Sequence, residues 1–235
     1  MSFLVAVYVH EGIVLASDRR TTYSNTQTID QKVIQRIGVH TTNSTDKTFL
    51  CPNGAGISTC GDASLMRKPI TGFIQEMIRT RITKDTKTAE IPQIIIDYFN
   101  GLEIVPDTHF IIAGYSHDED NTQHIYKVRV KEKTIETIDT SGQGATWDGE
   151  TITLTRLLQN LYIKTSEGNY LSLPNENILW EYFTLQDAVD FARYAVETTI
   201  QTMRFKNVVE TVGGNVDILV ITPDSSKWLQ KEALS

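Results

Sequence analysis

The stretch Met1-Ser2-Phe3-Leu4-Val5-Ala6-Val7 opens the chain, and Gly12-Ile13-Val14-Leu15-Ala16-Ser17-Asp18 follows after a short turn. Both runs are rich in apolar and β-branched residues, and the intervening His10-Glu11-Gly12 is typical of a tight turn. They predict a β-hairpin whose first strand begins at the chain terminus. Chain ends usually fray unless packing holds them, so a terminal strand of this kind needs a structural or a chemical reason.

Ser2 offers the chemical reason. Removal of Met1, which the small Ser2 side chain permits, would leave Ser2 with a free α-amine beside its hydroxyl. An α-amine has a reference pKa of about 7.7–8.0, so it is partly neutral at pH 7 and can accept the hydroxyl proton. We therefore expect Ser2 to be a candidate nucleophile that carries its own base.

Composition sets the broad class of protein. The 235 residues, 40% of them hydrophobic, can bury one substantial core, and no shift in composition marks a second domain. The formal net charge of −7 disfavours nucleic acid and anionic membranes as partners, and no apolar run approaches the roughly 20 residues of a membrane span. A cytoplasmic protein is the expectation. Cys51 and Cys60 lack zinc-site spacing and disfavour a disulfide framework, so we expect neither a metal nor a cofactor.

Blocks of strands alternate with blocks of helices, which favours antiparallel sheets covered by helices. Asp62 is expected to cap a first helix whose apolar stripe ends at Ile82, with Pro69 kinking its first turns or delaying its start. The polar residues 164–183 are expected to form an inserted loop, either a lid or a contact. The other predicted helices cover 92–100, 151–163 and 184–203, and the other predicted strands cover 31–39, 47–51, 54–60, 110–115, 124–130, 134–140 and 216–221.

Six short motifs occur along the chain: Val14-Leu15-Ala16-Ser17-Asp18-Arg19-Arg20, Lys32-Val33, Gly61-Asp62-Ala63, Ile112-Ala113-Gly114-Tyr115, Ser141-Gly142 and Gly213-Gly214-Asn215-Val216-Asp217-Ile218. In their order and spacing they resemble the proteasome β-type subunits and their bacterial relatives HslV and the Anbu proteins. The resemblance implies an α+β fold, a four-layer αββα sandwich typical of N-terminal-nucleophile hydrolases, with residues 1–235 forming one domain. It also implies a threonine/serine-type peptidase acting on peptide or protein substrates, self-assembly into a ring or helical oligomer, and an unfoldase as a further partner.

The resemblance also implies roles for individual residues. Ser2 matches the N-terminal nucleophile, Asp18 the acid, and Lys32 the active-site lysine after a two-residue deletion. The backbone N–H of Ser58 matches an oxyanion donor, and Ser141 matches a serine that hydrogen-bonds near the nucleophile. An ammonium beside the Ser2 hydroxyl would ease alkoxide formation, and an aspartate would hold that ammonium in place. The alternatives are a simple salt bridge for Asp18 and Lys32, an ordinary strand end for Ser58, and a turn serine for Ser141.

Two departures favour a different class of function. Val209 and Val212 stand where the family has the aspartate and serine that support the terminal amine, and valine side chains cannot form hydrogen bonds. Glu210 and Thr211 would substitute for them only after a shift of register. A retained Met1 would also acylate the Ser2 amine, which then cannot act as a base. The alternative function is a catalytically inactive, structural or binding subunit of the same fold.

The apolar stripe on the first predicted helix bears on assembly. It is wider than one sheet face needs, and an open patch of more than a few hundred Å² is a liability on a monomer. We therefore expect another copy of the chain to cover it, the alternative being that the stripe is core on both flanks. Its members are Leu65, Met66, Phe73, Met77 and Ile78.

Overall fold

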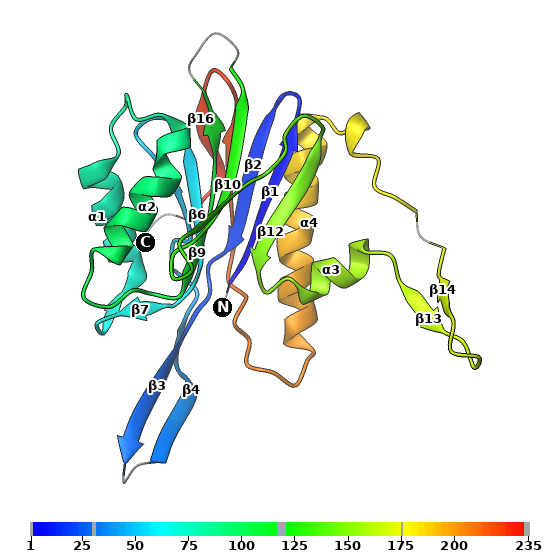
Figure 1. The fold of residues 1–235 in the computed structure, drawn as a ribbon, viewed down its shortest axis with the longest axis horizontal. Coiled ribbons are helices and arrows are strands. Elements are labelled where there is room, and N and C mark those ends of the chain that lie inside the picture. The colour runs from blue at the N-terminus through cyan, green and yellow to red at the C-terminus, as the bar shows by residue number, and fades with distance from the viewer. Residues whose placement is uncertain (1, 30–31, 117–120, 175, 233–235) are drawn as a thin grey trace.

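The computed structural model describes residues 2–29, 32–116, 121–174 and 176–232, and these form a mixed α+β structure of antiparallel sheets and four α-helices (Figure 1). The first five-stranded sheet has the order β12-β1-β2-β15-β16, and the second has the order β11-β10-β9-β6-β5. The first sheet contains β1 (Phe3–Val9), β2 (Gly12–Asp18), β12 (Gly144–Gly149), β15 (Val216–Ile221) and β16 (Ser226–Gln230). The second contains β5 (Thr48–Leu50), β6 (Gly56–Gly61), β9 (Thr108–Tyr115), β10 (Gln123–Arg129) and β11 (Thr134–Thr137).

The predicted N-terminal hairpin is confirmed, since β1 pairs antiparallel with β2 from Leu4–Ser17 to Val9–Gly12. β1 also pairs with β12 on its other edge, so its backbone is bonded on both sides. Its side chains alternate between two cores because successive strand residues point to opposite faces. Phe3 and Val5 face the core under one helix, whereas Leu4 and Ala6 face the second sheet.

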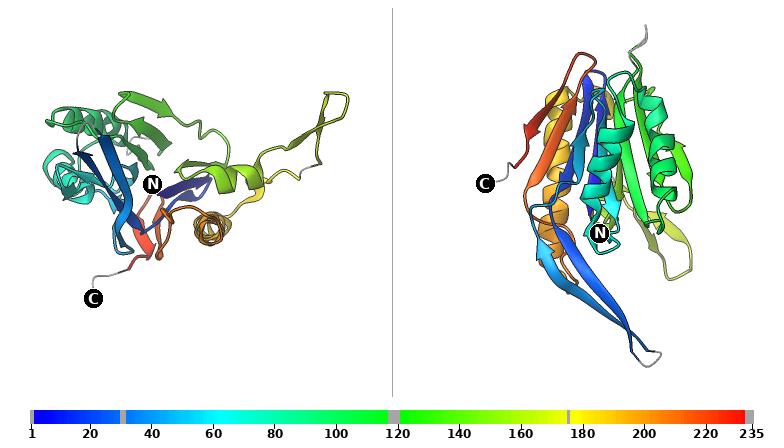
Figure 2. Two further views of the ribbon diagram at one scale, coloured as in Figure 1. Left: turned by 90° about the horizontal axis from the view of Figure 1, so that it is seen from below. Right: turned by 90° about the vertical axis from the view of Figure 1, so that its left-hand side faces the viewer.

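Three apolar cores arise from this arrangement. One lies between the first sheet and α4 (Leu185–Arg204), with α3 (Ile152–Leu158) at its edge. The second lies between the second sheet and the pair α1 (Ile70–Arg81) and α2 (Ile91–Asn100). The third lies between the two sheets themselves. Figure 2 shows α1 and α2 on one side of the sheets and α4 on the other.

Helix starts follow the local sequence. α1 begins directly after Pro69, so the predicted cap at Asp62 is wrong; the Asp62 carboxylate instead accepts the Asp107 N–H at 2.8 Å. Thr184 caps α4 as predicted, with its side chain accepting from the Asp187 N–H. α2 is also as predicted, with Pro92 in its first turn. α3 ends at Leu158, earlier than expected, and no helix within the described ranges has the length and hydrophobicity needed to cross a membrane.

Two hairpins project from the paired sheets in Figure 1. One is β3 (Thr21–Ile29) with β4 (Lys32–Thr42), and the other is β13 (Tyr162–Lys164) with β14 (Tyr170–Ser172). The second hairpin and the following 3-10 turn η2 (Trp180–Tyr182) occupy most of the expected inserted loop. The described chain also contains a short ribbon, β7 (Ser64–Leu65) and β8 (Lys68–Pro69), and the 3-10 turn η1 (Thr88–Glu90).

The apolar stripe of α1 and the segment before it is core. Leu65 and Met77 are buried, and Phe73 and Ile78 pack against the core under the second sheet. Met66 alone among the five stays substantially exposed, at 41%. The predicted open patch on α1 is therefore wrong, and the alternative that the stripe is core is confirmed.

Candidate active site

Asp18 ends β2 and is fully buried, yet each of its carboxylate oxygens accepts two hydrogen bonds. Oδ1 accepts the Phe3 N–H at 3.0 Å and the Lys47 ammonium at 2.8 Å. Oδ2 accepts the backbone N–H groups of Gly213 at 2.9 Å and Arg20 at 3.1 Å. Four donors match the roughly four lone-pair sites of an ionised carboxylate. The Asp18 carboxylate is thus fixed by four hydrogen bonds, one of which comes from Phe3, the residue next to Ser2.

Lys47 is the cation of this site. It directly precedes β5 and is buried, with only 3% of its surface exposed. Burial lowers the pKa of its ammonium, and the hydrogen bond and charge of Asp18 oppose that shift in part. The Asp18 carboxylate, 2.8 Å away, thus favours the charged form of a buried amine that burial alone would neutralise.

Lys32, the lysine expected from the sequence, lies elsewhere. It is exposed at the outer end of the β3–β4 hairpin, where it pairs with Ile29, while the base of the hairpin is the pair Thr21–Thr42. At about 3.3 Å per residue, the ten positions between Lys32 and Thr42 place it roughly 30 Å from that base. The expected contact between Lys32 and Asp18 is therefore wrong, because the long hairpin moves the site lysine to 29 positions after Asp18.

Ser2 directly precedes β1 and is 93% buried, and its carbonyl accepts the Glu150 N–H at 2.8 Å. Only glycine allows this close approach at position 149. Gly149 has a φ of +88°, and a Cβ added there would lie 1.9 Å from the Ser2 carbonyl oxygen. A small cavity of about 30 Å³ adjoins Ser2, enough for about one water molecule. Met1, whose removal we expect, lies outside the described residues. The cavity is lined by Ser2, Thr21, Thr22, Thr45, Asp46, Lys47, Thr59, Cys60, Gly61, Asp62, Ala63, Ile70 and Thr71.

The backbone of β6 directs one N–H toward this cavity. N–H groups of successive strand residues point to opposite neighbours. The Thr59 N–H donates to the Lys47 carbonyl at 2.8 Å, on the β5 side. The Gly61 N–H therefore points to that same side, where β5 has ended and the cavity begins. Any other residue at position 61 would be strained, because the φ of Gly61 is +113° and a Cβ there would lie 2.3 Å from the Asp107 carbonyl oxygen.

The Ser58 N–H points the other way, toward β9, where Ser58 pairs with Ile111. It is thus part of the interior of the second sheet and does not face the Ser2 cavity. The Ser58 side chain instead ends a buried chain of hydroxyls: Ser17 Oγ lies 2.8 Å from Thr48 Oγ1, which lies 2.8 Å from Ser58 Oγ. These hydroxyls link the two sheets next to the site, since Ser17 precedes Asp18 and Thr48 follows Lys47 in the sequence.

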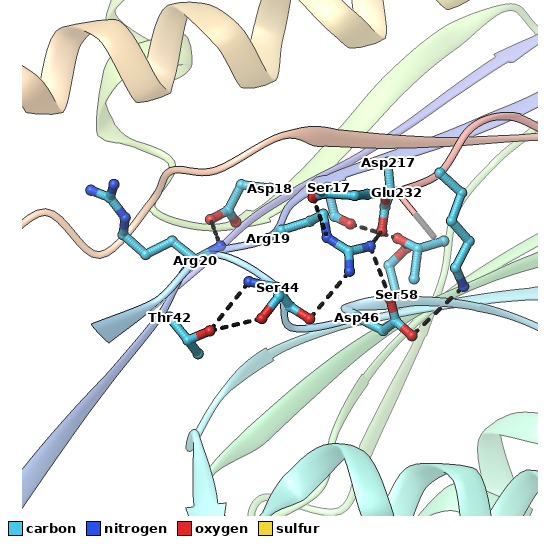
Figure 3. Close-up of polar contacts among 12 residues, drawn as sticks. Ser17, Asp18, Arg19, Arg20, Thr42, Ser44, Asp46, Ser58, Asp217 and Glu232 are labelled. Carbon is cyan, nitrogen blue, oxygen red and sulfur yellow. Dashed lines mark hydrogen bonds and ion pairs between the residues drawn. The ribbon is translucent and has the colours of Figure 1, made fainter. Parts of the chain in front are cut away.

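Arg19, which is itself buried, lies at the centre of a second ion-pair network (Figure 3). Its guanidinium lies 2.8 Å from Asp217 and 2.9 Å from Asp46, and it donates to the Ser44 carbonyl at 3.2 Å. Glu232 adds a fourth oxygen at 3.5 Å. Burial raises the pKa of Asp217, and the charge of Arg19 opposes that shift.

Arg19 and Asp18 together hold the segment that carries Lys47. The ion pairs Asp18–Lys47 and Arg19–Asp46 link consecutive residues of two antiparallel segments, and the Thr45 N–H donates to the Arg19 carbonyl at 3.1 Å. Sequence reasoning missed Lys47 and Arg19. The available signal was the charged pair Asp46-Lys47 directly before the apolar strand β5, together with a basic residue next to Asp18.

Ser141 lies at the opposite end of the β1–β12 pair. It is exposed, and its N–H donates to Asp139 at 2.9 Å. β12 runs from the pair Gly144–Tyr8 to the pair Gly149–Phe3, so about 3.4 Å per residue puts Ser141 more than roughly 17 Å from Ser2 along the strand. The expected position of Ser141 near the nucleophile is therefore wrong.

The segment before β15 contains the four residues that bear on support of the terminal amine, Val209, Glu210, Thr211 and Val212. Val212 is buried and Val209 is 44% exposed. Glu210 pairs with Arg20, and the Thr211 hydroxyl contacts the Met203 sulfur at 3.9 Å, so both are engaged with other partners. The backbone of this segment still reaches the site, since the Gly213 N–H donates to Asp18.

No protein-family model matches the chain, and no curated protein matches it significantly. Its fold is nevertheless similar to solved structures of Anbu. Anbu described as an ancestral beta-subunit, from Yersinia bercovieri, has a TM-score of 0.60 and 10% identity, covering 98% of this chain and 88% of that one. The Gly-1 mutant of Anbu from Hyphomicrobium sp. strain MC1 has a TM-score of 0.59 and 12% identity, covering 99% and 86%. A second Hyphomicrobium Anbu structure has a TM-score of 0.57, 12% identity and coverage of 98% and 88%. The likeness extends over nearly the whole chain and is one of fold.

Proposed function

We propose that the chain is an N-terminal-nucleophile hydrolase of the proteasome β-subunit type, which cleaves peptide amide bonds after Met1 is removed. The observation that carries this proposal is the buried Asp18–Lys47 pair held one residue from Ser2. The Anbu-like fold supports it, as does the placement of helices on the outer sides of two sheets with a core between them, the arrangement of a four-layer αββα sandwich.

Ser2 is the proposed nucleophile. Its hydroxyl oxygen attacks the substrate carbonyl carbon while its proton passes to the free α-amine, the local base. Lys47 stabilises the developing alkoxide charge, and Asp18 fixes the position of the Lys47 ammonium. The Gly61 N–H donates to the oxyanion of the tetrahedral intermediate in place of Ser58. The amine then returns the proton to the leaving nitrogen, and water hydrolyses the Ser2 ester.

A direct test compares three preparations with an electrophilic acylating probe, read by intact and peptide mass spectrometry. Protein starting at Ser2 should be labelled on Ser2 and should cleave small peptide amides. Protein retaining Met1 and the variant Ser2→Ala should do neither. Labelling of the Met1 form at the same rate would contradict the role of the amine as base.

A catalytically inactive subunit is the second candidate function. Val209 and Val212 favour it, because neither side chain can hydrogen-bond to the terminal amine. The cavity of about 30 Å³ at Ser2 also favours it, since a peptide needs more room than one water molecule. An absence of labelling in a preparation that starts at Ser2 would select this second function.

Self-assembly into a ring or helix is proposed for either function. Peptide substrates, and an unfoldase that delivers them, are proposed only for the catalytic function. The surface that supports assembly is the β13–β14 hairpin, where Tyr162, Tyr170 and Leu171 are 57–71% exposed. Light scattering after size exclusion should find a particle several times 26.5 kDa. The double variant Tyr170→Ser, Leu171→Ser should dissociate it, whereas Ile104→Ser, at an exposed apolar residue before β9, should not. A monomer at micromolar concentration would contradict assembly.

A further inference from the structure

Next to Ser2, three potential metal ligands converge from three strands. Cys60 lies on β6, His109 on β9 and Asp148 on β12, and one ligand atom from each lies within 4.8 Å of the others. Cys60 and His109 are direct cross-strand neighbours in the second sheet, whereas Asp148 belongs to the first. The cluster thus bridges the two sheets at the end of the core between them.

We propose that Cys60, His109 and Asp148 form a binding site for a zinc ion. Thiolate sulfur, imidazole nitrogen and carboxylate oxygen are the three ligand types that Zn²⁺ accepts in proteins, whereas calcium and magnesium prefer oxygen alone. Three protein ligands leave the fourth tetrahedral position open to water. The proposal does not depend on the hydrolase function of Ser2.

The distances require only a small adjustment. Bond lengths of about 2.0–2.3 Å around a tetrahedral ion set ligand atoms roughly 3.3–3.8 Å apart. His109 Nδ1 already lies 3.3 Å from Asp148 Oδ2. The widest of the three separations, at most 4.8 Å, therefore has to close by no more than about 1–1.5 Å, which a rotation of the partly exposed His109 side chain can supply. Cys60 is 95% buried and fixed by β6, so it anchors the site.

The surroundings supply both charge and access. Burial and the nearby Asp148 charge raise the pKa of the Cys60 thiol, which therefore carries its proton when no metal is bound. On binding, the S–H bond breaks, the proton goes to solvent and the sulfur bonds to Zn²⁺. Lys127 and Arg129 also act on this cluster as positive charges that oppose a cation. The His109 and Asp148 side chains are 24% and 13% exposed, so the ion can enter from their side.

The position gives the site a structural role beside Ser2. The Asp148 carboxylate accepts the Gly149 N–H at 2.7 Å, and Gly149 is the residue that packs against the Ser2 carbonyl. Cys60 also lines the cavity at Ser2. A bound ion would therefore fix β6, β9 and β12 relative to one another at the nucleophile.

The test uses the full chain after metal removal by a chelator. Zinc is titrated in competition with a chromophoric chelator, and cobalt is used as a spectroscopic probe of thiolate ligation. We expect one zinc per chain with a Kd of micromolar or tighter, a cobalt–thiolate charge-transfer band, and a rise in the thermal midpoint on zinc addition. Cys60→Ser and His109→Gln should each weaken binding by about 100-fold or more, because loss of a ligand exceeds the 10–100-fold effect of an outer-shell group.

Matched controls keep the proposal falsifiable. Cys51→Ser removes the other buried cysteine, which belongs to no such cluster among the described residues, and should leave zinc affinity and the cobalt band unchanged. Asp148→Asn keeps the side-chain shape if Cys60→Ser fails to fold, and it should weaken binding at least tenfold. No saturable binding by wild type, or equal affinity in wild type and Asp148→Asn, would overturn the proposal.

Discussion

The two ends of the β1–β12 strand pair differ in how deeply their polar groups are buried. At the Ser2 end, Asp18, Lys47 and Arg19 are all at least 97% buried and paired, and the adjoining cavity measures about 30 Å³. At the other end, a cavity of about 760 Å³ is lined mostly by exposed or half-buried residues, among them His10 and Ser141. Catalysis depends on charges fixed in a water-poor setting more than on volume. The comparison therefore locates the candidate chemistry at the smaller cavity.

The largest expected effect is on stability at the Ser2 end. Arg19→Ala would leave Asp217 buried without its cation, and breaking a buried ion pair costs about 3–5 kcal/mol. Urea unfolding should therefore show a loss of that size. Arg20→Ala is the control, because Arg20 and Glu210 are partly exposed and their pair should contribute less than about 1 kcal/mol. Equal losses in the two variants would contradict the distinction.

The second effect is on activity and rests on the proposed function. Lys47→Met removes the ammonium but keeps an unbranched side chain, and Asp18 retains three backbone N–H donors. Peptide cleavage or Ser2 labelling should fall by about 100-fold or more, as when one electrostatic stabiliser is removed. Lys32→Met, at the outer end of the β3–β4 hairpin, should leave the rate unchanged. The reverse result would restore Lys32 as the functional lysine.

A third pair of variants compares glycines at the two ends. Gly61→Ala places a Cβ 2.3 Å from the Asp107 carbonyl at a φ of +113°, which should cost about 1–3 kcal/mol and displace the proposed oxyanion N–H. Gly142→Ala, whose Cβ would have no atom within 4 Å, should be nearly neutral in both stability and rate. Thermal unfolding and cleavage assays check the two readouts separately. A neutral Gly61→Ala would contradict the tight approach of this backbone to Asp107.

The sequence pattern predicted the elements whose evidence is local. The β1–β2 hairpin follows from apolar, β-branched runs around a tight turn, and the Thr184 cap follows from its capping residues. The expected cap at Asp62 is wrong, whereas the expectation that Pro69 delays the start of the first helix is confirmed, because α1 begins directly after Pro69. Local signals thus located the strand ends at which the site is built.

The partners of Asp18 could not be predicted in the same way. Which lysine contacts Asp18 depends on the length of the β3–β4 hairpin, and sequence spacing alone does not give that length. The choice of Gly61 over Ser58 as the N–H facing the cavity depends on the β6 pairing pattern, and the cluster around Cys60 depends on two sheets meeting. Each is a property of tertiary arrangement, for which the residues involved lie far apart in sequence.

The stability of the Ser2 end should depend on pH through the His109–Asp148 pair. The hydrogen bond to Asp148 raises the pKa of His109, although burial opposes that shift. For Asp148, burial raises the pKa, but the His109 and Gly149 hydrogen bonds outweigh it and the net shift is downward. The His109 contribution to stability is therefore present below its ordinary pKa of about 6.5 and is lost as pH rises through its higher folded value. With a chelator present, His109→Gln should lose up to about 1 kcal/mol more at pH 5.5 than at pH 9. A larger loss at pH 9 would contradict this sign.

The smallest expected effect is at the opposite end of the strand pair. Ser141 is exposed, and both its backbone N–H and its side chain hydrogen-bond to the exposed Asp139; as a surface substitution, Ser141→Ala should still change stability by less than about 0.5 kcal/mol. Its distance from Ser2 also predicts an unchanged rate of Ser2 labelling or peptide cleavage. Side-by-side assays of Ser141→Ala and Lys47→Met in one preparation series would measure both ends on one scale. If Ser141→Ala abolished turnover in a folded protein, the chemistry would belong to the 760 Å³ cavity and the assignment at Ser2 would fail.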